Sequence, residues 1–600
     1  LRLLMVPLVA VLVFILLVHS GWWISGDQIV LHGGFSDGDS YLRLLRVERL
    51  IETGDWFDIS IPDANAPFGT TVHWTRLFDM VLLIMAAPMI PFLGFAKALF
   101  WAGVIVSPIV HMLAAVALAW AMLPLLGRAG AYFAAAMTAA QAGILAFALV
   151  GRADHHMMFI LFACLSLGLA IRVLMAADGW RQRAFGAGLV FAAGIWEGPE
   201  FLVFISLCLA VLGLPWLAGE PKAGEKNRAV IQGLLVGLIL AVLIERGVSG
   251  FLEIEYDRIS IVHVCFASLL LIFWSAATYA LGRRLHLASL PWRFALAGVG
   301  VITMALIMTT LYPKVLANPL NDVDPAVLPI FAHISEYQAT TGASQMLIYF
   351  GAALFAVPWL LRCLWKKWDG PQRWPWVLMA CALTLYLILG LNWLRWSLYA
   401  ALFLAIVIAD VLRHTDRRIN ASFSFPARLP LKLSAFLVLS IGPMIVGAIM
   451  LYDAKTPEER NAVNDDPCPV RELSAFLNQP PLSDSSRTIV ASANFGPEIV
   501  YRTDHKVLAT VHHRNAAGIL DGYRIMSGTG EMEVKNLMST RRVDLLLLCP
   551  ESSNDTYFLT DDDERSLYRR LQNNQLPSWL RSVDLPDGLS TKFRLFEVTG

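Results

Sequence analysis

The feature that most constrains this chain is a series of apolar segments, each about as long as a membrane is thick. A helix needs roughly 20 mostly apolar residues to cross the hydrocarbon core of a bilayer. With 57% hydrophobic and only 16% charged residues, the chain is unlike a soluble enzyme, in which about 25% of residues are charged. We therefore predict a polytopic α-helical membrane protein with thirteen spans in its 600 residues, at 3–22, 101–125, 131–150, 157–176, 184–198, 200–218, 229–246, 259–281, 293–312, 344–363, 374–391, 393–412 and 431–451.

The first apolar segment is predicted to be retained rather than cleaved as a signal peptide. Leu3–Val18 is followed by the polar pair His19 and Ser20, and no small-residue cleavage pattern comes after it. Trp22 and Trp23 follow instead, and tryptophan is enriched where a helix leaves the membrane.

The orientation depends on the segment 78–97, which is apolar but interrupted by Pro88 and Pro91. If this segment lies along the membrane surface, the basic loops all face the cytoplasm, as positively charged loops generally do. The basic residues concerned are Arg128, Arg181, Arg183, Lys222, Lys226, Arg228, Arg283, Arg284, Lys366, Lys367, Arg373, Arg413, Arg417 and Arg418. We therefore expect the N-terminus inside and the C-terminus outside.

This topology places four segments together on the outer side of the membrane: a long first loop at 23–100, a short loop at 151–156, a loop at 313–343 and the tail at 452–600. The chain then divides into a membrane domain at 1–451 and an extracytoplasmic domain at 452–600. Short β-type runs in the tail alternate with helical stretches and predict a small mixed α/β domain. These runs are Thr488–Ala491, Lys506–Thr510, Val543–Leu548 and Lys592–Val598. Cys468 and Cys549 are the only cysteines of the tail, and the sequence leaves open whether they pair.

Acidic and imidazole side chains stand out in two of the outer loops. Asp37 and Asp39 form an Asp-x-Asp pair, which suits a divalent cation held by oxygen ligands, although Asp and Gly are also common turn residues. Asp154, His155 and His156 follow an apolar span and could bind a metal or a phosphate, the alternative being a polar interfacial loop. Charged groups at the edge of a membrane span are costly, so we treat each as a candidate functional residue.

Two further outer positions carry charge. Glu336 lies in the stretch His333-Ile334-Ser335-Glu336 of the 313–343 loop, where a solvated carboxylate is the simpler alternative. Arg395 lies near the outer end of a span, where it could bind a lipid phosphate or extend toward the headgroups.

The order of these motifs resembles the catalytic subunits of oligosaccharyltransferases, which are membrane glycosyltransferases of the GT-C fold. The resemblance covers nearly the whole chain. In the first loop it includes Asp39, Tyr41, Val47-Glu48, the stretch Pro67–Thr70 and His73-Trp74, and in later loops Asp154-His155-His156, Glu336 and Arg395. It implies a polyprenyl-(pyro)phosphate-linked sugar as donor, attacked at its anomeric carbon with inversion, and a Mg²⁺ or Mn²⁺ ion as cofactor.

The resemblance also implies roles for individual residues. Asp39, Asp154 and His156 are expected to hold the metal, with Asp39 counted among the catalytic residues. His73, His155 and Arg395 are expected to contact the donor phosphate. Glu336 is expected to orient or activate the acceptor as a hydrogen-bond acceptor or general base.

One departure from the family concerns the acceptor. The family's tail carries Trp-Trp-Asp, which reads the hydroxyl of the acceptor sequon, whereas this chain has Ser492-Ala493-Asn494-Phe495-Gly496 at the corresponding place. Transfer to Asn-x-Ser/Thr is therefore in doubt. Asn494, His512 and His513 are candidate contacts to the acceptor or glycan, with an exposed turn as the alternative for the two histidines.

Other functions remain open. The main alternative is a GT-C transferase that moves a single sugar from a polyprenyl monophosphate to a lipid, a glycan or a protein. A transporter or flippase typically has repeats and charges at the bilayer midplane, and the sequence contains no internal repeat. A membrane scaffold does not need acids and histidines in three outer loops. A net charge of zero gives no indication of nucleic-acid binding. The Ala-, Leu-, Gly- and Arg-rich composition predicts a bacterial cytoplasmic membrane, with a periplasmic active site.

Overall fold

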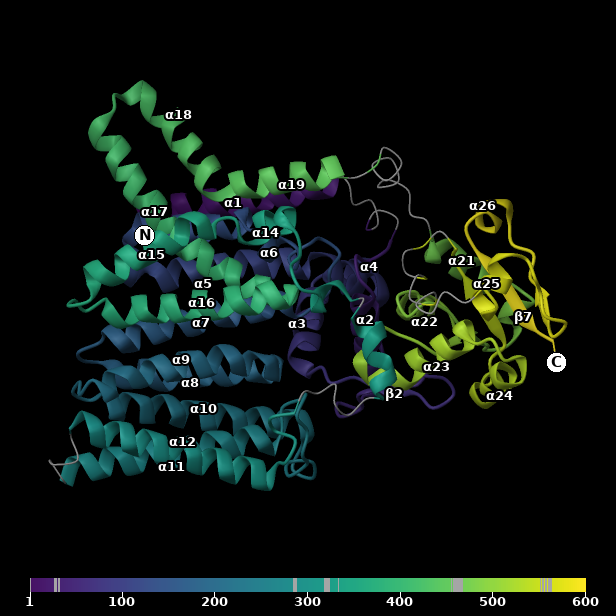
Figure 1. The fold of residues 1–600 in the computed structure, drawn as a ribbon, viewed down its shortest axis with the longest axis horizontal. Coiled ribbons are helices and arrows are strands. Elements are labelled where there is room, and N and C mark those ends of the chain that lie inside the picture. Colours follow the sequence, from purple (N-terminus) through teal and green to yellow (C-terminus); the bar gives the residue numbers. More distant parts are fainter. Residues whose placement is uncertain are drawn as a thin grey trace.

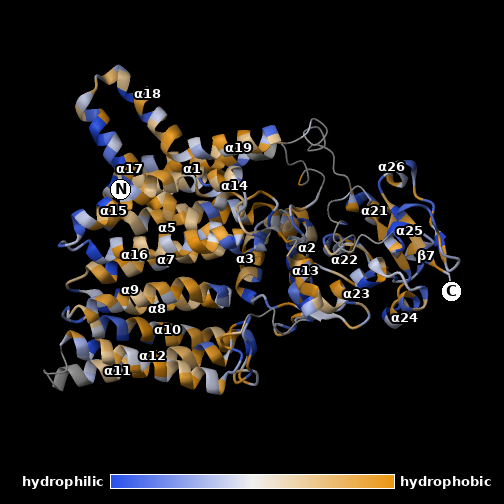
Figure 2. Ribbon diagram, viewed as in Figure 1, coloured by the Kyte–Doolittle hydropathy of each residue, from blue (hydrophilic) through white to orange (hydrophobic). Residues whose placement is uncertain are grey.

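The protein consists of a helical bundle and a smaller mixed domain at one end of it, with the first loop between them (Figure 1). The computed structural model describes residues 2–25, 30, 33–283, 289–317, 324–332, 334–454, 456, 468–550, 552, 555, 558 and 564–599. Hydrophobic residues dominate the helices of the bundle, whereas the smaller domain mixes hydrophobic and hydrophilic residues (Figure 2).

The bundle confirms the predicted fold class of a polytopic helical membrane protein. Among the described residues, nine helices are long and apolar enough to cross a membrane, or ten if one bent pair counts as a single span. All thirteen predicted segments are helical over most of their length. The helices are α1 (Arg2–Ser25), α5 (Phe95–Met137), α7 (His156–Met175), α8 (Trp180–Glu197), α9 (Leu202–Leu217), α10 (Ala223–Arg246), α11 (Ile261–Arg283), α12 (Leu290–Leu311), α14 (Ala343–Phe350), α15 (Ala353–Lys367), α16 (Arg373–Asn392), α17 (Ser397–Ser422), α18 (Phe425–Phe436) and α19 (Gly442–Ala454).

Three of the thirteen predicted spans differ in form from a single straight helix. The predicted spans 101–125 and 131–150 share helix α5, which breaks at Gly127 (φ 70°), and the second continues into the short elements η1 (Thr138–Ala140) and α6 (Ala142–Leu145). The predicted span 344–363 is the bent pair α14 and α15, whose axes meet at 49°.

Small residues bring the axes of α8 and α10 close together. A Cβ atom at Gly188 would lie 1.9 Å from the carbonyl oxygen of Val230, and one at Gly233 would lie 2.0 Å from that of Phe185. Close backbone approach at glycine is a common way to pack membrane helices, because dispersion contacts rather than the hydrophobic effect hold them together.

The segment 78–97 forms short helices, as expected for a segment that does not cross the membrane. It contains α3 (Arg76–Ala86) and α4 (Ile90–Leu93), which have 11 and 4 residues. A helix of 11 residues spans about 16 Å, roughly half of the hydrocarbon core.

The first loop begins with α2 (Gly38–Thr53) and also contains a small hairpin of β1 (Ser60–Ile61) and β2 (Thr70–Thr71). Asp37 caps α2, because its side chain accepts a hydrogen bond from the amide of Ser40. The loop at 313–343 contributes η5 (Pro325–Val327), α13 (Leu328–Phe331) and η6 (Ser335–Tyr337).

The tail contains a five-stranded sheet with the order β4-β3-β5-β7-β6, in which β3 pairs in parallel with β4 and β5, and β7 runs antiparallel to its neighbours. The four predicted β runs are confirmed as β3 (Thr488–Val490), β4 (Lys506–Val507), β5 (Leu545–Leu548) and β7 (Arg594–Val598), and β6 (Leu580–Ser582) completes the sheet. The helices around it are α21 (Val470–Leu477), η10 (Leu482–Asp484), α22 (Gly496–Arg502), η11 (His513–Asn515), α23 (Ala516–Ser527), α24 (Glu531–Arg541), α25 (Leu567–Gln572) and α26 (Asp587–Ser590).

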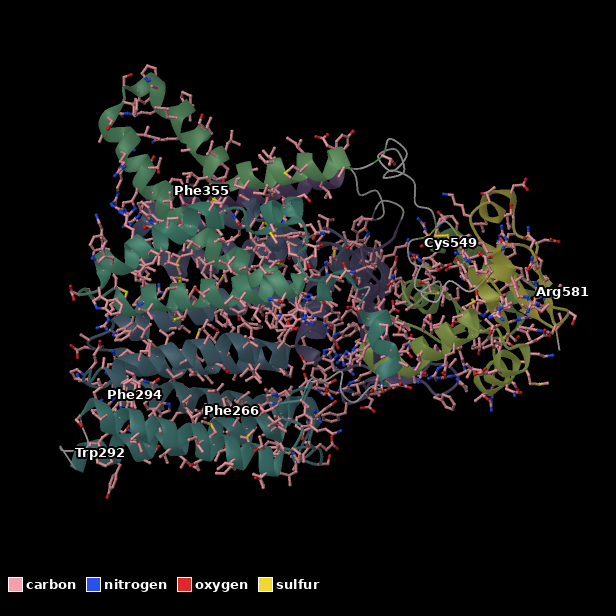
Figure 3. All side chains as sticks on the ribbon, viewed as in Figure 1. Phe266, Trp292, Phe294, Phe355, Cys549 and Arg581 are labelled. Atoms are coloured by element: carbon pink, nitrogen blue, oxygen red, sulfur yellow. A yellow bond between two sulfur atoms is a disulfide. The ribbon has the colours of Figure 1, made fainter. Side chains whose placement is uncertain are left out.

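A disulfide bond joins Cys468 to Cys549, a pairing that the sequence alone left open. Cys549 follows β5 and lies inside the C-terminal domain (Figure 3). The bond ties the segment that enters the domain to its central sheet.

The first loop docks onto the edge of this sheet through backbone hydrogen bonds. The amide of Ala66 donates to the carbonyl of Val507 at 3.1 Å, and the amide of Val507 donates to the carbonyl of Asp63 at 2.8 Å. Nearby, Arg541 Nη1 donates to Asn65 Oδ1 at 2.9 Å. The C-terminal domain is therefore held against the same loop that carries the Asp-x-Asp motif.

Candidate metal and phosphate site

The start of α2 packs directly on the short loop at 151–156. The amide of Ser36 donates to the carbonyl of Gly151 at 2.9 Å, and the amide of Ala153 donates to Ser40 Oγ at 2.8 Å. Gly151 has a φ of +80°, and a Cβ atom there would lie 2.3 Å from a methyl group of Val30. Two motifs more than a hundred residues apart in the sequence therefore meet at one end of the bundle.

Three carboxyl groups surround the guanidinium group of Arg152, and a fourth is close to one of them in the sequence. The guanidinium nitrogens lie 2.9 Å from Asp37 Oδ2, 3.5 Å from Asp154 Oδ2 and 2.7 Å from Glu336 Oε1. Asp39 lies two residues after Asp37, and burial, followed by the charges of Asp154 and Asp37, raises the pKa of its carboxyl group to about 8. The guanidinium groups of Arg152 and of Arg43, which lies 4.0 Å from Asp154 Oδ1, are fewer than the four carboxyl groups, so the cluster can accommodate an additional cation.

Glu336 joins this cluster from the 313–343 loop. Burial alone would raise the pKa of its carboxyl group, but the charges of His156 and Arg152 outweigh burial and lower the pKa. Glu336 is therefore ionised at neutral pH. His333, the first residue of the predicted motif, lies outside the described residues.

Asp154, His155 and His156 can supply three ligand atoms that all lie within 4.8 Å of one another. Asp154 Oδ1 lies 2.6 Å from His155 Nδ1, and Asp154 Oδ2 contacts His156 Nδ1. His156 Nε2 is buried without a hydrogen-bond partner and lies 3.9 Å from Glu336 Oε2. This unpartnered nitrogen, together with the surplus of carboxylates, fits a divalent cation held by oxygen and imidazole ligands.

Arg395 lies at the edge of this cluster. Its Nη1 donates to the hydroxyl of Tyr337 at 3.3 Å, and its Nη2 is ion-paired with Glu200. Tyr337 follows Glu336 in η6, so the guanidinium group lies close to the carboxylate cluster, and its side chain is 22% exposed. The Glu200 partner was not predicted, because it lies almost two hundred residues away in the sequence.

His73 belongs to a second cluster, formed with two histidines of the C-terminal domain. His73 Nδ1 lies 2.8 Å from His512 Nε2, and its ring centroid lies 4.8 Å from that of His513. Asp257 Oδ2 accepts a hydrogen bond from His513 Nε2 at 3.2 Å. The structure thus groups a residue predicted for the donor phosphate with two predicted for the acceptor. Asn494, the third predicted acceptor contact, lies exposed in the turn between β3 and α22.

Arg43, which the sequence reasoning missed, connects the two clusters. Its Nη2 donates to His155 Nδ1 at 2.6 Å, and its guanidinium group lies 3.9 Å from the ring centroid of Trp74. Trp74 in turn contacts His512 edge-on, at 5.1 Å between ring centroids. The Nε and Nη1 atoms of Arg43 are buried without hydrogen-bond partners. The available signal was its helical spacing, since Arg43 lies one turn after Asp39.

Glu197, at the end of α8, is a further buried acid near the site. Both of its carboxylate oxygens are buried without hydrogen-bond partners. Within the described part of the chain, these oxygens and the two unpartnered nitrogens of Arg43 are available for hydrogen bonds to a ligand.

No family model matches the sequence, and no curated protein matches it. Among solved structures, the archaeal oligosaccharyltransferase AglB from Archaeoglobus fulgidus is similar in three states. Its complex with an inhibitory peptide and a dolichol-phosphate has a TM-score of 0.73 at 12% identity, covering 98% of this chain and 80% of that chain. The apo form, with a TM-score of 0.74 at 12% identity, and the complex with Zn and sulfate, with 0.72 at 11%, have the same coverage.

The chain has the oligosaccharyltransferase fold. This agrees with the fold expected from the motifs in the sequence, and it includes both the helical bundle and the C-terminal domain. At 11–12% identity the similarity concerns the fold, so the chemistry must be argued from the residues of this chain.

Proposed function

We propose that the chain is a metal-dependent membrane glycosyltransferase that transfers a glycan from a polyprenyl-(pyro)phosphate donor to an acceptor. One observation carries this proposal: Asp37, Asp154 and Glu336 come from three distant segments and converge on Arg152, with His156 beside Glu336 and Asp39 two residues after Asp37. The similar AglB structures bind a dolichol-phosphate in one case and Zn with sulfate in another. A lipid phosphate and a divalent cation are the ligands that such a cluster suits.

In this proposal Asp39, Asp154 and His156 hold a Mg²⁺ or Mn²⁺ ion. When bound, the ion stabilises the negative charge that develops on the phosphate leaving group. Arg152 keeps the loop at 151–156 against α2, because its guanidinium group bridges Asp37 and Glu336.

The donor phosphate is assigned to cationic and N–H groups that surround the carboxylates. Arg395 would exchange part of its contact with Glu200 for the lipid phosphate, and His155 and His73 would donate from the other side. Arg43 adds two buried nitrogens without partners between these histidines. Charge-assisted hydrogen bonds of this kind contribute about 1.5–3 kcal/mol each.

Glu336 is assigned to the acceptor. Its lowered pKa leaves it ionised, so it can accept a hydrogen bond from the attacking hydroxyl or amide group and take up its proton. Attack from the face opposite the phosphate would invert the anomeric carbon.

We place the site on the outer face of the cytoplasmic membrane. The distribution of basic loops supports this orientation, and the Cys468–Cys549 disulfide in the adjoining domain suits an oxidising compartment such as the periplasm.

The deciding experiment uses the full chain in detergent with a defined polyprenyl-pyrophosphate sugar. Transfer or donor hydrolysis should require a divalent cation, should stop with EDTA and should return with Mn²⁺ or Mg²⁺. Chelator-resistant activity, or uptake of an intact solute by proteoliposomes without sugar release, would contradict the proposal.

A second candidate is transfer of a single sugar from a polyprenyl monophosphate to a lipid, a glycan or a protein. The turn after β3 favours it, because the exposed Asn494 and its neighbours replace the Trp-Trp-Asp of sequon-reading members. Mass spectrometry of the lipid that copurifies with an Asp154→Ala variant distinguishes the candidates by the number of sugars and phosphates. Transfer to peptides with and without an Asn-x-Ser/Thr sequon then tests the acceptor.

A further inference from the structure

The histidine cluster of His73, His512 and His513 joins the first loop to the C-terminal domain, and its three rings suit two different roles. They could chelate a cation, since their ligand atoms lie within 4.8 Å of one another. Alternatively, they could form a chain of hydrogen bonds that orients one imidazole. The partner of each ring nitrogen distinguishes these roles.

His512 has a defined tautomer. Its Nδ1 accepts a hydrogen bond from the backbone amide of Arg514 at 3.2 Å. A backbone N–H can only donate, so the proton of a neutral His512 ring must be on Nε2. His512 is 4% exposed, and burial together with the charges of His513 and His73 holds its pKa well below the usual value, which makes the neutral form the relevant one.

The tautomer of His512 determines that of His73. The N–H at His512 Nε2 points to His73 Nδ1 at 2.8 Å, so His73 Nδ1 must accept. Burial, followed by the charges of His513 and Arg514, also lowers the pKa of His73 well below its usual value. A neutral His73 therefore carries its proton on Nε2. In the described part of the chain, nothing hydrogen-bonds to that Nε2 atom.

The turn that supplies the first donor is itself held in place. The guanidinium group of Arg514 pairs with Asp257 at 2.7 Å and also with Glu255, both in the loop after α10. The buried Asn515 donates to the carbonyl of Leu508 at 3.1 Å. The backbone amide of Arg514 is thus fixed from both domains.

We propose that His512 is a positioning residue, through which the C-terminal domain makes His73 present an N–H, rather than a lone pair, to the phosphate of the lipid-linked donor. The inference rests on the proposed function, since it requires a phosphate beside His73. A lone pair at this position would repel a phosphate oxygen, whereas an N–H binds it. The tail would therefore contribute to donor binding without touching the donor.

The chelate is the less favoured role, because His512 Nε2, the atom nearest His73, carries a proton and has no lone pair for a cation. His513 Nε2 already lies against Asp257. Each ring thus has a hydrogen-bond partner that the chain itself provides.

The first test needs no variant. Nitrogen NMR of the full chain labelled with ¹⁵N-histidine should show His512 and His73 as neutral rings, both protonated on Nε2. Protonation of His73 on Nδ1, or metal coordination shifts at the three rings, would overturn the inference. So would a cation that copurifies with the wild type and with Asp154→Ala but not with His513→Ala.

The second test measures binding of a polyprenyl phosphate and the KM and kcat for the donor. His512→Leu removes the donor to His73 and should weaken phosphate binding about 10- to 100-fold, the usual effect of losing an orienting partner. His512→Gln places an amide N–H near the former Nε2 and should restore binding to within about threefold of wild type. The loss should appear in KM more than in kcat.

His505→Gln is the matched control. His505 is a buried histidine of the same domain, whose Nδ1 likewise accepts a backbone N–H, from Arg487 at 3.2 Å, but whose Nε2 meets a backbone carbonyl. This variant should bind phosphate like the wild type. Equal binding by His512→Leu and His512→Gln in folded protein would overturn the inference. If the wild type itself binds no polyprenyl phosphate, the proposed function fails, whereas the NMR result still tests the chain of hydrogen bonds.

Discussion

The two polar clusters at the end of the bundle have similar residue types but different charge balances. The first contains the carboxyl groups of Asp37, Asp39, Asp154 and Glu336 with two histidines, and these carboxyl groups outnumber the guanidinium groups of Arg152 and Arg43. The second contains three histidines, and the charges beside it are already paired, because Arg514 binds both Asp257 and Glu255. A group of histidines near carboxylates is thus insufficient to define a metal site.

The difference is also visible in unpartnered atoms. In the first cluster, His156 Nε2 is buried with no hydrogen bond. In the second, both nitrogens of His512 are engaged. An unpartnered nitrogen beside several carboxyl groups fits a metal ligand, whereas a ring with both nitrogens bonded fits a structural or orienting role. The following predictions are ordered by their expected effect on sugar transfer.

The largest effect is expected from the centre of the first cluster. Asp154→Ala removes a carboxylate that contacts both histidines and should lower transfer on the order of 10³-fold, as the loss of a key electrostatic group does. It should also abolish Mn²⁺ binding, measured by calorimetry or by electron paramagnetic resonance. Asp257→Ala is the control from the second cluster and should leave Mn²⁺ binding unchanged. Equal loss of Mn²⁺ binding in both variants would show that the two clusters do not differ in their role in metal binding.

Arg395→Gln should have the next largest effect. The substitution removes the guanidinium group that we assign to the lipid phosphate. The affinity for polyprenyl phosphate should fall roughly 10- to 100-fold, which corresponds to the loss of one charge-assisted hydrogen bond. Mn²⁺ binding should stay, because Arg395 contacts Glu200 and Tyr337 rather than the carboxylate cluster directly. Unchanged phosphate affinity in a folded Arg395→Gln variant would show that Arg395 does not bind the lipid phosphate.

Asp257→Asn should have a moderate effect. The substitution weakens the pairing of Asp257 with Arg514 and with His513 across the domain boundary, by about 1 kcal/mol for a partly exposed group. Hydrogen exchange should rise in η11 and in the loop after α10, and donor affinity should fall a few-fold at most. Faster exchange throughout the bundle would instead show that Asp257 supports the whole fold.

The smallest effect on transfer is expected from the disulfide. Cys468→Ser should lower the free energy of unfolding of the C-terminal domain by about 2–5 kcal/mol, the usual range for a native disulfide in a small domain. Transfer by the folded protein should persist, because Cys468 and Cys549 belong to neither cluster. Thermal unfolding followed with and without reductant measures the first effect, and a parallel transfer assay measures the second. A matched Cys208→Ser variant keeps the disulfide, so reductant should destabilise it as it does the wild type, whereas Cys468→Ser should be insensitive to reductant.

Several features of this protein follow from residues close together in the sequence. Apolar runs of about 20 residues require a membrane environment, and the predicted segments are helical. Alternating β-type runs located four strands of the tail, since strand formation depends on local patterning. Acids and histidines at span ends identified Asp154, His155 and His156 as a group, because these residues are adjacent in the chain.

Other features depended on the way distant segments dock. Arg43 acquires its importance only when α2 packs beside His155 and Trp74. Glu200 becomes the partner of Arg395 across almost two hundred residues of sequence. Local patterns say which face or loop a side chain occupies but not which other loop comes to lie against it.

His73 shows this difference most clearly. Its motif marked it as a polar residue of the first loop, but its partner His512 comes from a different domain, more than four hundred residues later. The hydrophobic pattern and the backbone preferences of a segment depend on a few neighbouring residues, so the sequence predicted the helices, the strands and the polar loops. Hydrogen-bond direction and charge balance depend on the three-dimensional neighbours of each group, so only the folded chain distinguished the candidate cation site from the cluster of hydrogen-bonded histidines.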